Sequence, residues 1–154
     1  TIKAAAFPGG FVSDGYKVTV PAVHNSPGKN GKELVNPAPC VITGGALSTS
    51  TNKASMVLTN NSSSTVTINK ITITFPSGNG KLKKISQGPA VIFNSAAGVS
   101  SPATVSSFSG TPNDRSIAAT SSKTIMFEFV NNALATGYTI DIDFGTAGIW
   151  RLTA

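Results

Sequence analysis

Three carboxylates in the C-terminal part of the sequence combine residue type and spacing in a way that could support chemistry. Asp141 and Asp143 alternate on one predicted strand, so both project from the same face. If the segment KTIMFEFV pairs with that strand as a hairpin, Glu128 joins them. Three such acids could hold a hard cation such as Ca²⁺, or two could act as a glycosidase pair. We favour a solvated outer face, whose charge is offset by the lysines of the segment GKLKK.

The other reactive groups are isolated in the sequence. There is one histidine, His24, in a predicted loop, and one cysteine, Cys40, at the start of a predicted strand. One histidine and one cysteine form a zinc site only together with carboxylates. An isopeptide crosslink from a lysine would need a buried acid, for which Glu128 and Asp141 are the candidates. Both lie at polar positions, so we expect no catalytic, metal or cofactor site and no enzyme.

The composition indicates an all-β protein. The chain has 154 residues, of which 40% are apolar and 12% are charged, against about 25% charged in an ordinary soluble protein. Ser, Thr and Asn take much of the place of charge, and they suit strands and turns. A single cysteine excludes an internal disulfide, and we expect it to be a buried thiol, with an intermolecular disulfide as the alternative.

The net charge of +6 bears on possible partners. A basic protein attracts glycans or surface polymers that are anionic, but the lysines are scattered rather than clustered. We therefore expect no nucleic-acid partner. Nothing in the sequence reaches eighteen consecutive apolar residues, so we predict no membrane span. No signal peptide is visible, and a chain that begins at Thr1 fits a processed polypeptide, so we expect an extracellular or cell-surface location.

Residues 40–154 are predicted to form a β-sandwich of about 7–10 strands. Short alternating apolar segments follow one another there at the spacing typical of sandwiches, and no helical period is evident. Asn79-Gly80 is a strong hairpin signal. In TVTINKITITFP, residues 65–76, the apolar parity changes at Asn69-Lys70. We expect a β-bulge there, with a tight turn between two strands as the alternative.

Residues 1–39 are predicted to be an extended N-terminal arm with long loops. The arm carries strand-like apolar side chains, and glycine-rich joints separate it from the sandwich. Its predicted contact residues are Ile2, Phe7, Phe11, Tyr16, Val18 and Val20. At the other end of the chain, Ile149, Trp150 and Leu152 are either core or a second interface, and we favour core.

The segment SMVLTNNSSSTVTINKITITFPSGNGKLKKISQGPAVIF resembles Ig-like, Greek-key sandwich domains of bacterial and archaeal cell-surface and pilus-like filament proteins. The later segments SIAATSSKTIMFEFVNN and GYTIDIDF look like the closing hairpin of such domains. The resemblance covers residues 53–145 and implies an extracellular structural or adhesive role. Pilin-type members begin with a long apolar helix, which this chain lacks unless the helix was removed.

The sequence also contains two overlapping N-x-S sequons, at Asn60 and Asn61, in a predicted turn. In an exported protein either asparagine could carry a glycan, and a bare turn explains the same residues.

These observations predict a structural subunit of an extracellular filament or pilus. We expect the arm of one copy to enter the sandwich of a neighbour as a donor strand, which joins the copies head to tail. The alternative is a cell-surface carbohydrate-binding or adhesion module, in which Trp150 and Tyr16 would be the aromatic residues that stack on sugars.

Overall fold

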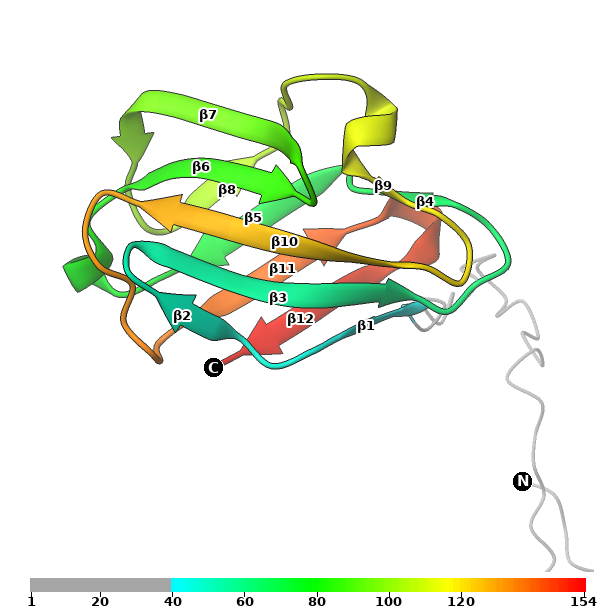
Figure 1. The fold of residues 1–154 in the computed structure, drawn as a ribbon, viewed down its shortest axis with the longest axis horizontal. Helices are drawn as coiled ribbons and strands as arrows, with labels where there is room; N and C mark the ends of the chain where they lie inside the picture. Colours follow the sequence, from blue (N-terminus) through cyan, green and yellow to red (C-terminus); the bar gives the residue numbers. More distant parts are fainter. Residues whose placement is uncertain (1–39) are drawn as a thin grey trace, which may run out of the picture. The chain divides into compact units, whose positions relative to one another are not determined.

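Alternating apolar and hydroxyl side chains form antiparallel strands throughout residues 40–154, which are the residues that the computed structural model describes (Figure 1). The prediction of an all-β sandwich is confirmed. The described residues form twelve strands, more than the predicted 7–10, because several are only two or three residues long. The strands are β1 (Ile42–Gly44), β2 (Ser48–Ser50), β3 (Lys53–Asn60), β4 (Val66–Thr67), β5 (Lys70–Thr74), β6 (Leu82–Gln87), β7 (Ala90–Val99), β8 (Ala103–Val105), β9 (Ser116–Ile117), β10 (Ser122–Phe129), β11 (Thr139–Asp143) and β12 (Ile149–Thr153).

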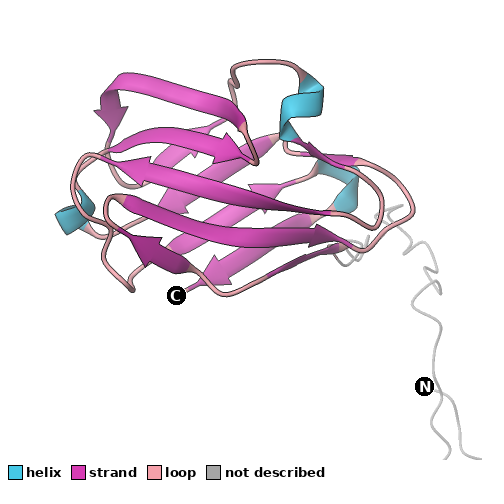
Figure 2. Ribbon diagram, viewed as in Figure 1, coloured by secondary structure: helices cyan, strands magenta, loops and turns pink. Residues whose placement is uncertain are grey.

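The strands lie in two main layers, which Figure 2 shows in magenta. One sheet has the order β1-β3-β10-β6-β7, with β2 also pairing with β3, and the other has the order β12-β11-β5-β8. A small third sheet pairs β4 with β9. Three short 3₁₀ helices lie in the connections within residues 40–154: η2 (Ser77–Asn79), η3 (Pro112–Arg115) and η4 (Gly145–Ala147). The layers bury their facing sides against each other, as a sandwich requires.

The core consists of the alternate residues of the central strands. In β10 the buried residues are Ile125, Phe127 and Phe129, whereas Met126 and Glu128 point outward. The same period of two runs through β3, β5 and β11, where the apolar residues on the inward parity are fully or almost fully buried and Val57 of β3, on the outward parity, is exposed. The assignments of these four strands from alternation are therefore confirmed.

The parity change in residues 65–76 marks a passage between two sheets. Val66 in β4 and Ile71 in β5 are both buried, although they lie on opposite parities. The N–H of Ile68 donates to Arg115 O, at the end of η3 and directly before β9 of the small sheet (3.0 Å), and the next N–H, of Asn69, donates to Asp143 O of the four-stranded sheet (2.8 Å). Two strands in different sheets thus replace both the predicted bulge and the predicted tight turn.

Asn79-Gly80 is not a hairpin turn, so that prediction is wrong. The dipeptide ends the crossing from β5 in one sheet to β6 in the other. The Asn79 side chain is fully buried; its Nδ2 donates to the Tyr138 hydroxyl (2.7 Å), and its Oδ1 accepts from the N–H of Leu134 (3.0 Å). Asn79 therefore pairs polar groups at a junction of the two layers.

The predicted closing hairpin of β10 and β11 is also wrong. β10 pairs with β3 and β6, whereas β11 pairs with β5 and β12 in the opposite sheet. The chain between the two strands crosses the end of the sandwich. Glu128 consequently lies on the outer face of one layer, and Asp141 and Asp143 lie on the outer face of the other.

A close contact between Gly44 and Trp150 joins the layers where β1 and β12 approach each other. A Cβ atom built on Gly44 would overlap the Trp150 indole ring. The absence of a side chain at Gly44 therefore lets the ring pack against the core. Gly45 is a matched neighbour without this constraint, because the nearest atom to its Cβ position is Val57 O at 3.7 Å.

We expect Gly44→Ala to lower the free energy of unfolding by about 1–3 kcal/mol, the usual cost of overpacking. Trp150 is the one tryptophan, so its fluorescence should shift as the ring moves toward water. Urea unfolding measures the first effect. Gly45→Ala is the control and should change neither quantity; equal stabilities of the two variants would contradict the contact's role.

Candidate functional site

The two aspartates of β11 form ion pairs on the outer face of the four-stranded sheet. Asp141 accepts two hydrogen bonds from Arg151 of β12, at 2.6 Å from Nε and 2.7 Å from Nη2. Asp143 lies 4.0 Å from the Nζ atom of Lys70 on β5. The hydrogen-bonded guanidinium of Arg151 holds the pKa of Asp141 below its ordinary value. Each carboxylate is therefore offset by a cation on a neighbouring strand.

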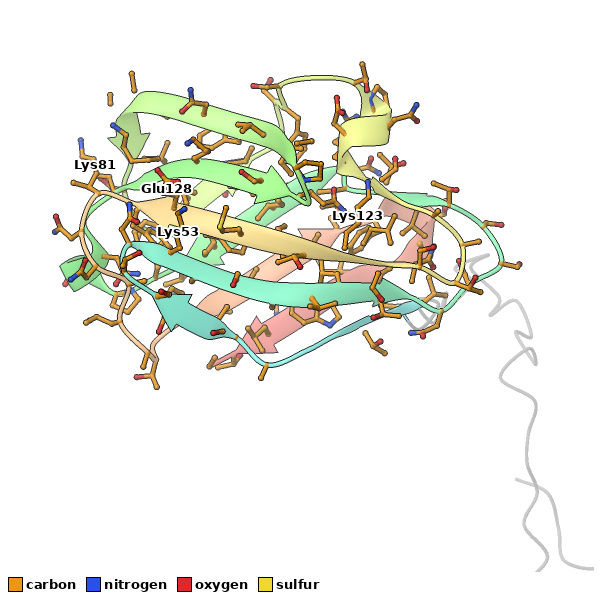
Figure 3. All side chains as sticks on the ribbon, in the orientation of Figure 1. Lys53, Lys81, Lys123 and Glu128 are labelled. Carbon is orange, nitrogen blue, oxygen red and sulfur yellow. The ribbon has the colours of Figure 1, made fainter. Side chains whose placement is uncertain are left out.

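Glu128 lies on the opposite layer and also sits between cations. It is directly across from Lys53 of β3 on one side and from Lys84 of β6 on the other. Its carboxylate is 3.6 Å from the Lys84 ammonium. Figure 3 shows Lys53, Lys81 and Glu128 at one end of the sheet. The three acids do not converge, and residues 40–154 hold no group of three or more metal-ligating side chains.

These positions bear on the crosslink considered from the sequence. The side chains of Glu128 and Asp141 are 25% and 26% exposed, so neither is the buried acid that an isopeptide reaction needs. A fourth carboxylate, that of Asp114, accepts from the backbone N–H and the hydroxyl of Thr111, and these hydrogen bonds lower its pKa. That contact caps η3.

The first sequon asparagine is part of the core. Asn60 is fully buried, and its Nδ2 donates to the carbonyls of Ser64 (2.8 Å), Ile117 (3.1 Å) and Ala118 (3.0 Å). Its Oδ1 accepts from the backbone N–H (3.0 Å) and the hydroxyl (2.8 Å) of Ser62. The atom to which a glycan would be attached is thus enclosed and fully hydrogen-bonded in the folded domain.

The second sequon asparagine is accessible. Asn61 is exposed, and its Nδ2 donates to Val41 O (3.2 Å) and to the Thr43 hydroxyl (3.0 Å) across the end of β1. Of the two predicted acceptors, Asn61 is the one that the folded domain presents to solvent. Glycosylation itself stays a prediction.

The described residues display no exposed aromatic side chain for sugar stacking. Trp150 is half-buried against the core, and so is Cys40. The large exposed apolar residues of this part of the chain are aliphatic: Val57, Val91, Val130, Leu134 and Ile149. The other predicted residues lie outside the described residues: Ile2, Phe7, Phe11, Tyr16, Val18, Val20 and His24.

The sheet edges are the remaining candidate for function. In residues 40–154, β7 and β12 are the longer strands with a neighbour on one side only, and β1, β2 and β8 are edge strands of three residues each. Unpaired edges accept further strands. Sequence analysis placed Ile149, Trp150 and Leu152 in the core, whereas Ile149 is 57% exposed and the other two are half-buried at an edge. Alternation alone could not reveal which strand ends a sheet.

Comparisons with known proteins add no relative: no protein-family model matches this sequence, and no curated protein matches it significantly. Among the described residues, no helix has the length and apolar character needed to cross a membrane.

We expect Asn60→Ala to lower the free energy of unfolding by about 3 kcal/mol, because several buried carbonyl and N–H groups lose their hydrogen-bond partner. Asn61→Ala, its exposed neighbour, should cost less than about 0.5 kcal/mol. Urea denaturation of both variants measures the difference. Equal costs would show that the Asn60 network contributes little.

The Asp141–Arg151 pair predicts a small acid-dependent contribution to stability. The folded pKa of Asp141 is lowered from its unfolded value of 3.8, so this stability is present above pH 3.8 and is lost as pH falls through the folded pKa. Because the pair is exposed, we expect Asp141→Asn to cost about 0.5 kcal/mol at pH 7, and this cost should shrink as pH falls through the folded pKa of Asp141. In an Arg151→Gln background the pH-dependent effect of the substitution should be clearly smaller, because the largest cause of the lowered pKa is gone; an unchanged pH dependence there would contradict the assignment.

Proposed function

We propose that this protein is a structural subunit of an extracellular filament, in which the N-terminal arm of one copy adds a strand to the sandwich of the next. The observation that carries the proposal is the combination of a well-buried core with unpaired sheet edges in residues 40–154. An added strand would extend a sheet at its edge, and it would not need to fill a gap in the core. Head-to-tail addition that does not close produces a filament.

The chemistry of the described outer faces supports a structural role. Their carboxylates are held in cross-strand pairs with lysine or arginine, or in the helix cap of Asp114. Their hydroxyl-rich strands present no concentrated set of nucleophile, base and acid. The Ig-like resemblance and the predicted extracellular location fit the same proposal.

The carbohydrate-binding alternative receives less support. Sugar stacking needs an exposed aromatic ring, and Trp150 packs on Gly44 and the core instead. That alternative then depends on Tyr16 or on the lysines near Glu128, of which Lys81 is exposed and Lys53 and Lys84 are half-buried. A polysaccharide pull-down with the monomeric protein distinguishes it from assembly.

Analytical ultracentrifugation and negative-stain microscopy over a range of concentrations test the proposal. The full chain should form a ladder of oligomers or fibres, and deletion of residues 1–20 should leave a folded monomer. A full chain that stays monomeric, or a deletion that assembles equally well, would overturn the proposal.

Substitutions within the arm sharpen this test. Val18 and Thr19 are neighbours of opposite parity, so an added strand would turn one toward the core and the other toward solvent. We expect Val18→Asp to abolish assembly and Thr19→Asp to leave most of it. Equal effects would argue for attraction by charge rather than strand addition.

A further inference from the structure

The pairing of β12 with β11 shows which backbone N–H and C=O groups of β12 lie on its free edge. Tyr138 and Ala154 exchange both backbone hydrogen bonds (2.8 and 2.9 Å), and the N–H of Phe144 donates to Gly148 O (3.0 Å). The register between the strands is regular. In an antiparallel pair hydrogen-bonded positions alternate, so Trp150 and Leu152 direct their backbone groups toward β11. The N–H and C=O groups of Ile149, Arg151 and Thr153 therefore point away from the sheet.

No side chain of β12 shields this edge. Natural edge strands are commonly protected by charged residues, bulges or proline. The charged residue of β12, Arg151, is turned back over the sheet face by its two hydrogen bonds to Asp141. Ile149 and Thr153 are exposed, and the strand contains no register shift toward β11. Figure 1 shows β12 in red at the border of its layer.

The other edges of the described domain are less suitable. β7 shifts register twice against β6, and two of its carbonyls are occupied, Ile92 O by the N–H of Ser109 (2.8 Å) and Ala96 O by the Lys83 ammonium (2.9 Å). The remaining edge strands have only two or three residues each. β12, with five regular residues, is the best template for an incoming strand.

We propose that β12 of one copy receives residues 16–20 of a second copy as an added antiparallel strand. This inference rests on the proposed function and names the surface at which assembly takes place. The occupant comes from the chain outside the described residues: YKVTV alternates apolar and polar side chains, contains no glycine, and ends at Pro21. Antiparallel pairing that places Thr19 across from Arg151 also places Lys17 across from Thr153.

Side-chain chemistry supports this register. Trp150 and Leu152 lie on the inner face of β12 and are only half-buried. Val20 and Val18 would lie across from them and cover their exposed sides, because directly paired residues share a face. Lys17 would lie beside Thr153 rather than beside Arg151, which avoids a direct contact between like charges. Pro21 would lie across from Ile149. Because proline has no backbone N–H to donate, the added strand would end there.

Substitution of Arg151 tests the edge. Arg151→Pro removes an N–H that points away from β11, so the pairing inside the domain is kept, whereas Arg151→Ala removes the same ion pair and keeps the N–H. We expect the concentration for half-assembly to rise roughly tenfold in Arg151→Pro relative to Arg151→Ala, the factor for one lost backbone hydrogen bond. Circular dichroism confirms folding.

Crosslinking tests the register independently, and it decides the question if the proline variant fails to fold. In a Cys40→Ser background, Lys17→Cys chains are mixed with Thr153→Cys chains and oxidised. A hydrogen-bonded pair has Cα atoms about 5.5 Å apart, within disulfide range. Mass spectrometry should identify the 17–153 disulfide between chains. Thr104→Cys, at the exposed β8 edge, replaces Thr153→Cys as the control and should not crosslink.

The outcomes separate the two proposals. If arm deletion abolishes assembly but Arg151→Pro assembles as Arg151→Ala does and no 17–153 crosslink forms, the β12 site is wrong and the filament proposal stands. If arm deletion has no effect, both fail. A doubly substituted chain that forms the 17–153 disulfide only within itself would also overturn the proposal, because the arm would then complete its own sheet.

Discussion

The fold depends on satisfying backbone polar groups where the chain crosses between layers. The Asn60 side chain makes hydrogen bonds where the chain leaves β3 for β4, and the Asn79 side chain does so where the chain leaves β5 for β6. A buried carbonyl or N–H without a partner is costly, and each crossing leaves several such groups outside the sheet ladders. At these two crossings a buried asparagine amide pairs with several of them. The two layers can therefore exchange strands repeatedly without opening the core to water.

This arrangement also explains where the charges lie. The core is apolar, and at these two crossings the backbone groups pair with the neutral amides of Asn60 and Asn79. The carboxylates of the strands therefore lie on the outer faces. There they pair across strands with Lys70, Lys84 and Arg151. Exposed pairs contribute little stability individually, but they neutralise the sheet faces and keep like charges apart.

Local patterns predicted the strands well and their partners poorly. The alternation of Ile125, Phe127 and Phe129 identified both β10 and its buried face, because side-chain period is a local property. The hairpins expected at Asn79-Gly80 and between β10 and β11 were wrong, because partner choice depends on contacts between distant residues. Asn79 has the residue type of a turn, but its hydrogen bonds to Tyr138 and Leu134 make it a buried junction. Asn60 was likewise interpreted from its sequon alone.

The sequence could not show which strands lie at the sheet edges, because edge position also depends on contacts between distant residues. Its edge position is what makes β12 a candidate site for an added strand. A five-residue strand with regular alternation and no proline would be an aggregation hazard if it stayed uncovered in a monomer. β7 is protected by register shifts and by hydrogen bonds to its carbonyls, whereas the one arginine of β12 is held by Asp141 on the sheet face. Protection of one edge and exposure of the other is an asymmetry that a monomer does not need. A chain that joins its copies in one direction needs one receptive edge and one that is blocked.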